Sequence, residues 1–205
     1  DSLSFTTIQG YVGEQLFGLR MPMMTIILAI VLFTGITATD EDRGTLTSQL
    51  SLPISRTRLL LEKYLAATTI LTIIHIAIAV GIVATLAGIH ESLSLLRLFE
   101  TIFGCWLLSL SFGTITFLCG AATGLKSITV GVSSYIIFQA YLLSSLVTTI
   151  DKLKPIERFS FFHYYKSGDI IRNGISGWDT LILIGITFIM FGLGIVAFQR
   201  RDIRN

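Results

Sequence analysis

Residues 65–89 read LAATTILTIIHIAIAVGIVATLAGI, a run without lysine, arginine, aspartate or glutamate. At about 1.5 Å per residue, a helix of this length crosses the roughly 30 Å hydrocarbon core of a bilayer. Four further apolar runs, almost free of charge, occupy residues 21–38, 98–122, 128–150 and 180–198. A strand of a membrane β-barrel is a segment of about ten residues in which apolar and polar residues alternate, and none of these runs shows that pattern. We therefore predict an all-α, polytopic membrane bundle with five spanning helices, forming one transmembrane domain over residues 1–205.

The composition agrees with a membrane protein. Hydrophobic residues make up 52% of the chain and charged residues 14%, whereas soluble domains carry about 25% charged residues. The net charge of +2 is scattered along the chain, so no basic surface for a nucleic-acid partner is expected. Cys105 and Cys119 lie fourteen residues apart in one predicted helix, too far for a disulfide.

The orientation follows from lysine and arginine, which favour the cytoplasmic side of a membrane. The two faces carry similar numbers, but those on the face of the 39–63 loop cluster directly beside helix ends. They are Arg43, Arg56, Arg58, Lys63, Lys126, Arg200, Arg201 and Arg204. We expect this face to be cytoplasmic and the protein to reside in the cell membrane.

Five spans then place Asp1 outside the cell, and we expect a further span upstream of Asp1. Residues 1–20 would join that span to the 21–38 helix. Phe5, Ile8, Val12, Leu16 and Leu19 recur at spacings of three and four, a pattern typical of an amphipathic helix at the membrane surface.

The 39–63 loop reads TDEDRGTLTSQLSLPISRTRLLLEK. Residues 45–52 favour a short helix, with Asp40, Glu41 and Asp42 near its N-terminus, where the helix dipole stabilises negative charge. Pro53 ends this helix, and Ser55 caps the next one. A short helix at this place is suited to rest on a partner at the membrane surface; an ordinary solvated loop is the alternative.

Several residues of this loop resemble the signature of the membrane subunits of type-2 ATP-binding-cassette (ABC) exporters. They are Glu41, Gly44, Thr45, Leu46, Leu50, Pro53, Ser55, Arg56 and Lys63. Residues 198–203, FQRRDI, are similar to the ending of that family after its last span. Residues 159–174, FSFFHYYKSGDIIRNG, are similar to its last extracellular segment.

The resemblance implies a permease with six spans, of which the first is absent here. Two permeases, identical or different, would work on two cytoplasmic ATPase subunits, and the 39–63 loop would be the coupling segment. ATP and Mg would be bound by the ATPase chain, with no cofactor and no catalysis on this one.

Two catalytic motifs fail on inspection. Residues 120–127, GAATGLKS, approach a nucleotide-binding loop, but Leu125 separates the glycine from the lysine. His90 and Glu91 lack the second histidine of a metalloprotease helix. Asp40, Glu41 and Asp42 are interpreted as stabilised by the helix dipole rather than as metal ligands, so no metal site is predicted.

Polar residues within the spans are the candidates for a translocation path: Thr34, Thr37, Ser134, Tyr141, Ser145 and Thr148. Those on 128–150 fall on one helix face, and packing between helices is the alternative role. His75 and Gln139 lie near the middle of their spans. For His75 we favour a hydrogen bond between helices over a proton relay, because no span offers acidic neighbours.

The 151–179 segment, on the face opposite the loop, is rich in aromatic residues, which we expect at the headgroup level of the membrane. They are Phe159, Phe161, Phe162, Tyr164, Tyr165 and Trp178.

Taken together, the sequence predicts an exporter permease, and the uncharged spans favour apolar or lipid-like cargo. A secondary transporter is one alternative, although it would carry paired charges inside its spans. A membrane scaffold or assembly factor that transports nothing is the other.

Overall fold

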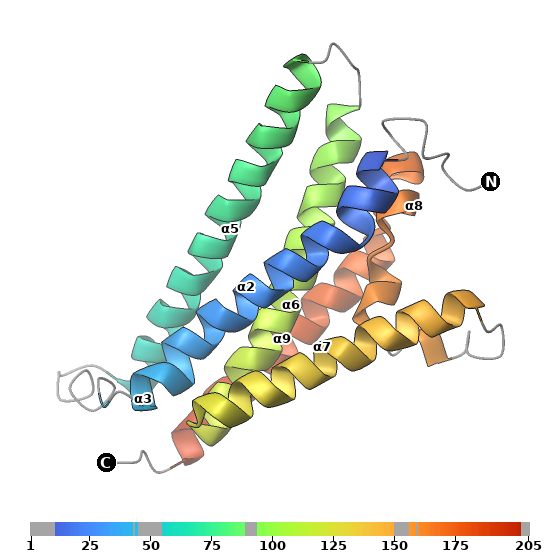
Figure 1. The fold of residues 1–205 in the computed structure, drawn as a ribbon. Coiled ribbons are helices and arrows are strands. Elements are labelled where there is room, and N and C mark those ends of the chain that lie inside the picture. The colour runs from blue at the N-terminus through green and yellow to red at the C-terminus, as the bar shows by residue number, and fades with distance from the viewer. Residues whose placement is uncertain are drawn as a thin grey trace.

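Five long helices dominate the structure, a computed structural model that describes residues 11–42, 44, 55–88, 94–149, 156–158 and 160–201 (Figure 1). In chain order its elements are η1 (Tyr11–Arg20), α2 (Met21–Thr34), η2 (Gly35–Thr39), α3 (Asp40–Asp42), α5 (Arg56–Gly88), α6 (Leu95–Thr123), α7 (Lys126–Thr149), η4 (Phe161–Tyr164), α8 (Ser167–Asn173) and α9 (Gly177–Arg200). Of these, η1 and η2 are π-helical and η4 is a 3-10 helix. The described residues contain no strand, and the all-α prediction is confirmed.

The helices long and apolar enough to cross a membrane are Gln15–Asp42, Arg56–Gly88, Leu95–Thr123, Lys126–Val147 and Gly177–Arg200. Each one covers most of a predicted run, so the chain is a multi-pass helical membrane protein. The helix α5 begins well before residue 65 because Ser55 caps it, as predicted: the backbone N–H of Arg58 donates to Ser55 Oγ at 3.2 Å.

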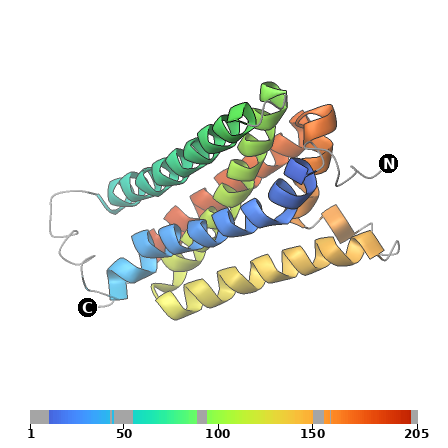
Figure 2. The ribbon, with the colours of Figure 1, turned by 45° about the horizontal axis from the view of Figure 1, so that its top comes forward.

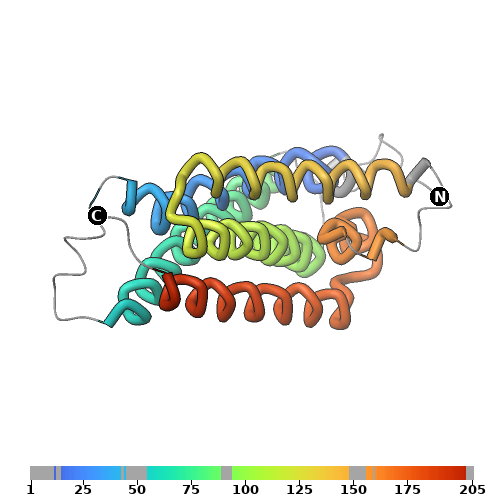
Figure 3. Tube along the Cα trace, turned by 90° about the horizontal axis from the view of Figure 1, so that it is seen from below, coloured from blue at the N-terminus to red at the C-terminus, as the bar shows by residue number. Residues whose placement is uncertain are grey.

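The helix α6 forms the centre of the bundle. In its most apolar window 78% of residues are buried, against 22–39% in the other four spans. It packs against α2, α5, α7, α8 and α9. Figure 2 shows α5 and α7 on opposite sides with α2 between them, and Figure 3 shows α6 between α7 and α9.

Hydroxyl groups join α6 to three of its neighbours. Ser109 Oγ lies 2.7 Å from Thr25 Oγ1 of α2, and Ser111 Oγ lies 2.9 Å from Thr187 Oγ1 of α9. Thr114 Oγ1 lies 2.7 Å from the hydroxyl of Tyr64 on α5. Such pairs hold membrane helices together where burial of apolar surface gives little driving force.

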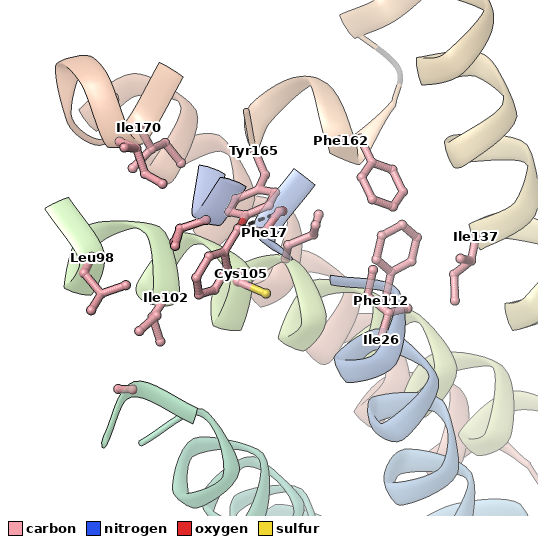
Figure 4. Close-up of a cluster of buried hydrophobic side chains, with 14 of the residues drawn as sticks. Phe17, Ile26, Leu98, Ile102, Cys105, Phe112, Ile137, Phe162, Tyr165 and Ile170 are labelled. Atoms are coloured by element: carbon pink, nitrogen blue, oxygen red, sulfur yellow. Dashed lines mark hydrogen bonds between the residues drawn. The ribbon is translucent and has the colours of Figure 1, made fainter. Parts of the chain in front are cut away.

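The chain between α7 and α9 folds back into the bundle. Phe162 and Tyr165 are buried, and the Tyr165 hydroxyl donates to the carbonyl of Phe17 at 3.3 Å. Figure 4 shows Tyr165 beside Phe17 and Cys105, and Phe162 near Phe112. Both rings therefore pack into the bundle rather than facing lipid, because η4 and α8 turn them inward, and their level in the membrane stays a prediction. Trp178 is 73% exposed, and Phe159 lies outside the described residues.

The predicted surface helix over residues 1–20 takes a different form where the structure describes it. The segment η1 continues directly into α2, since Arg20 has helical backbone angles. It packs against α2 and α8. Val12 and Phe17 are buried, Leu16 is half-buried and Leu19 is exposed; Phe5 and Ile8 lie outside the described residues.

Candidate functional site

Four segments that are distant in sequence meet at one end of the bundle, here called the loop end. They are α3, the start of α5, the turn between α6 and α7, and the end of α9 (Figure 1). Three of the four carry residues of the motifs on which the resemblance rests. The loop end is therefore the candidate functional site.

Glu41 is the buried charge of the loop end. The α2 span continues through η2 into α3 without a break, which carries Glu41 to the rim of the bundle. Gly44 follows with φ of 70°, and its N–H donates to the Glu41 carbonyl at 2.9 Å. The side chain of Glu41 is 4% exposed, so its carboxylate requires a charged partner.

That partner is Arg201, the first residue after α9. Arg201 Nη2 donates to Glu41 Oε2 in an ion pair, and the Arg201 side chain is 17% exposed. The guanidinium also lies 6.0 Å from the centre of the Phe198 ring, a distance at which a cation is attracted to the ring face. The loop and the tail, which carry the two strongest sequence motifs, are thus in direct contact.

Gly124 makes room for this ion pair. It ends α6 with φ of 64°, and its N–H donates to the Gly120 carbonyl at 2.9 Å. A Cβ at Gly124 would collide with the Arg201 guanidinium and the Glu41 carboxylate. A glycine is required here both by the left-handed backbone and by the space that the two charges occupy.

The start of α5 is tied to the same assembly. Lys63 Nζ lies 2.5 Å from Asp40 Oδ2, and both side chains are largely buried. Arg56 Nη1 donates to the Arg201 carbonyl at 3.4 Å, and Gln199 Nε2 donates to Thr57 Oγ1 at 2.8 Å. The described segments on either side of residues 45–54 are therefore bound to each other and to the tail.

Several predicted loop residues can now be placed. Glu41, Gly44, Ser55, Arg56 and Lys63 lie at the loop end. Thr45, Leu46, Leu50 and Pro53 lie outside the described residues, so the predicted helix over 45–52 stays a prediction.

The predicted path residues fall into two groups. Thr34 and Thr37 of α2 and η2 are buried in the bundle, where Thr37 Oγ1 donates to the Phe33 carbonyl at 2.8 Å. Ser134 and Ser145 are exposed on α7 and Tyr141 is half-buried. Thr148 belongs to α7, but its side chain lies outside the described residues. Within the described part of a single chain, the buried threonines of α2 and η2 and the polar residues of α7 do not form a common surface.

The polar residues in mid-span bond within their own helices. His75 Nδ1 lies 2.9 Å from the Leu71 carbonyl, and Gln139 Nε2 donates to the Tyr135 hydroxyl at 2.8 Å. His75 Nε2 is buried and has no hydrogen-bond partner among the described residues, so this chain does not form the hydrogen bond between helices that we favoured for His75. Its Nδ1 carries the proton, because a carbonyl oxygen only accepts.

Sequence reasoning missed the Glu41–Arg201 pair and the hydroxyl pairs of α6. A separation of 160 residues offers no spacing signal for an ion pair. The hydroxyl pairs could have been anticipated, because Ser109, Ser111 and Thr114 are polar residues in a span whose other residues are mostly apolar.

Comparison with known proteins supplies a family but no activity. No curated protein matches the chain. A family model described as "Protein of unknown function (DUF2705)" matches residues 3–204. Because this match covers almost the whole chain, including the loop and the tail, the protein belongs to the DUF2705 family.

Proposed function

We propose that the chain is the permease subunit of a type-2 ABC exporter. In this proposal it forms the translocation path in the cell membrane, and a separate subunit binds and hydrolyses ATP with Mg. The observation that carries the proposal is the meeting of Glu41 with Arg201 at the loop end. The loop and tail motifs of the resemblance were identified separately, and a common mechanical role gives a reason for their contact.

The anchoring of the loop suggests how force would be transmitted. An ATPase that moves the 45–54 stretch would pull on α2 through α3 and on α5 through Ser55. The Glu41–Arg201 pair would pass the same movement to α9, and Gly124 would pass it to the turn between α6 and α7. A shift at this one place would thus reach all five spans.

A second permease is expected to cover the outer face of α7. Gln139, Tyr135 and Ser134 are exposed there, and polar groups on a spanning helix favour contact with another helix over contact with lipid. Gly131 is also exposed, with open space around it, which permits close approach of a neighbouring backbone. The second permease would be a copy of this chain or a related one.

The test starts with purification of the full chain from its native membrane in mild detergent. The proposal predicts that an ABC ATPase subunit co-purifies and that the complex hydrolyses ATP. If no ATPase subunit is retained under conditions that preserve known membrane complexes, the ABC proposal is wrong.

A second measurement separates transport from the scaffold alternative. Deletion of the gene should reduce ATP-dependent efflux of at least one apolar compound from a panel, and the intact gene should restore it. Unchanged efflux of the whole panel, with the ATPase complex present, would favour a scaffold. Efflux that follows an ion gradient and persists without ATP would favour a secondary transporter.

A further inference from the structure

The last turn of α9 fixes the level of the loop end in the membrane. The apolar run 180–198 extends over about 28 Å at about 1.5 Å per residue, close to the hydrocarbon thickness of about 30 Å. Phe198 therefore lies at the edge of the hydrocarbon core. Arg200 follows two residues later, so its Cα lies about 3 Å beyond that edge. The headgroup layer is about 5–8 Å thick on each side of the core, so Arg200 lies within it.

The side chain of Arg200 points away from the bundle. Phe198 is 2% exposed and packs in the core. A residue two positions further lies about 200° around the helix from it, and Arg200 is exposed as this geometry requires. The guanidinium of Arg200 therefore faces the lipid headgroups rather than the protein interior.

The first turn of α5 brings a second exposed arginine, Arg56, to the same level. Arg56 Nη1 donates to the carbonyl of Arg201 at 3.4 Å. Gln199 Nε2 donates to Thr57 Oγ1 at 2.8 Å, and Figure 3 shows the start of α5 beside the end of α9. A guanidinium has five N–H donors, so this single contact leaves Arg56 able to bind an anion.

The loop end carries more positive than negative charge. Residues 39–63, 126 and 199–205 contain eight basic and five acidic residues. Three ion pairs among the described residues already engage carboxylates there: Glu41 with Arg201, Asp40 with Lys63, and Glu62 with Arg58. No described residue forms an ion pair with Arg56 or Arg200.

The level of these two arginines in the membrane identifies the anion. Guanidinium groups bind phosphate oxygens through paired, charge-assisted hydrogen bonds, and phospholipid phosphates occupy the headgroup layer. The first turn of α5 adds backbone N–H groups that have no partner within the helix, in the positive field of the helix dipole. An aqueous protein partner would approach from beyond this layer, whereas the phosphates are already within it.

The surplus of positive charge also selects among phospholipids. The ammonium group of phosphatidylcholine is repelled by Arg56 and Arg200, while a headgroup with a net negative charge is attracted. Basic residues near a membrane surface each strengthen the binding of anionic lipid about fivefold.

We propose that Arg56 and Arg200 form a binding site for the phosphate of one anionic phospholipid, where the first turn of α5 meets the last turn of α9. The site goes beyond the permease proposal and does not depend on it. It requires only the multi-pass bundle and the contact between α5 and α9.

Native mass spectrometry of the full chain in mild detergent tests this site. The chain is titrated with phosphatidylglycerol and, separately, with phosphatidylcholine, and the fraction of chains that carry one lipid gives each dissociation constant. Phosphatidylglycerol should bind at least about fivefold more tightly than phosphatidylcholine. Arg56→Gln and Arg200→Gln should each weaken the binding of phosphatidylglycerol about fivefold, and the double variant should weaken it further.

Arg58→Gln is the matched control. It removes the same charge from the same turn of α5, but Arg58 is already paired with Glu62, so the binding of phosphatidylglycerol should change less than about twofold. Arg56 and Arg200 are exposed, so their variants are expected to fold. An unchanged midpoint of thermal unfolding in lipid-free micelles checks this directly.

Three outcomes would overturn the proposal. An equal loss of binding in Arg56→Gln, Arg200→Gln and Arg58→Gln would show a diffuse attraction rather than a site. Displacement of phosphatidylglycerol by an equal concentration of inorganic phosphate would show a site for free phosphate. Unchanged lipid binding in Arg56→Gln and Arg200→Gln, together with loss of a co-purifying ATPase subunit, would assign both arginines to a protein contact.

Discussion

Glu41 and Arg201 are 160 residues apart in the chain and form an ion pair at the loop end of the bundle. The pair closes a ring of contacts that also includes Lys63 with Asp40 and the Gly124 turn. Both charges are largely shielded from water. Mutation of this pair is therefore the most direct way to disturb the contacts at the loop end.

Loss of one charge of this pair should destabilise the fold. Glu41→Ala leaves Arg201 without its carboxylate, and removing one partner of a buried pair costs about 3–5 kcal/mol. Glu62→Ala is the control, because Glu62 pairs with Arg58 on the exposed surface of α5, where such pairs contribute about 0–1 kcal/mol. Equilibrium unfolding in mixed micelles measures both. Equal losses for the two variants would contradict the burial of the Glu41 pair.

Gly124 should not tolerate a side chain. Gly124→Ala forces alanine into a left-handed backbone, which costs roughly 1–2 kcal/mol, and drives Cβ into Arg201 and Glu41. Gly81→Ala on α5 is the matched control: its Cβ meets open space, and alanine in a helix is about 1 kcal/mol better than glycine. The first variant should lower the midpoint of thermal unfolding and the second should raise or preserve it. The reverse order would refute this account of the turn.

The hydroxyl pair between α6 and α9 should couple the two helices. Ser111→Ala and Thr187→Val each remove one hydroxyl of the 2.9 Å contact. A double-mutant cycle should give a coupling free energy of about 0.6 kcal/mol, the usual size for hydrogen bonds between membrane helices. The same cycle on Ser111 with Thr180, whose hydroxyl bonds to the Ser176 carbonyl, should give none. Strict additivity in the first cycle would show that the contact does not stabilise the bundle.

The inward-folded segment before α8 should loosen at acid pH. Burial raises the pKa of Glu157, but hydrogen bonds and charges from His163 and Lys166 outweigh it and hold this pKa below its ordinary value of 4.5. A carboxyl group with a lowered pKa stabilises the fold above its unfolded pKa, and the contribution is lost as pH falls from about 4.5 through the folded pKa. Hydrogen exchange of residues 160–166 should therefore speed up below pH 4.5 in the parent chain.

Glu157→Gln is the control for this pH effect, since an amide does not titrate. Its exchange should show a weaker dependence on pH over the same window, after correction for intrinsic chemical exchange. Identical pH profiles for the parent and Glu157→Gln would exclude this carboxylate as the cause.

The spans could be predicted from the sequence, and the contacts within them could not. Runs such as 65–89 are apolar over the full thickness of a bilayer, so length and composition decide them. Burial depends on which faces meet: Phe162 and Tyr165 have the composition of a headgroup belt, yet they insert into the bundle because η4 and α8 fold back. His75 illustrates the same limit, since its hydrogen bond goes to the preceding turn of its own helix.

At the candidate site too, individual residues could be predicted from the sequence but their contacts could not. Glu41 and the tail arginines were recognised separately as parts of motifs, and Ser55 was predicted as a cap from its place after Pro53. Their assembly at one end required the fold, since α9 has to return to the loop end for Arg201 to reach Glu41. Residues 120–127 were considered only as a nucleotide-binding loop, and the role of Gly124 in seating the ion pair depends on a side chain 77 residues further along the chain.

The central claim is that an ATPase subunit acts on the loop end, and Glu41 offers the most direct test. ATP hydrolysis and substrate efflux are measured in the complex purified from its native membrane, reconstituted in vesicles, for the parent chain, Glu41→Gln and the control Glu62→Gln. The account predicts that all three retain the ATPase subunit and hydrolyse ATP, while Glu41→Gln alone loses most of the efflux per ATP hydrolysed. A Glu41→Gln complex with undiminished efflux per ATP, or a parent chain that carries no ATPase subunit, would contradict it.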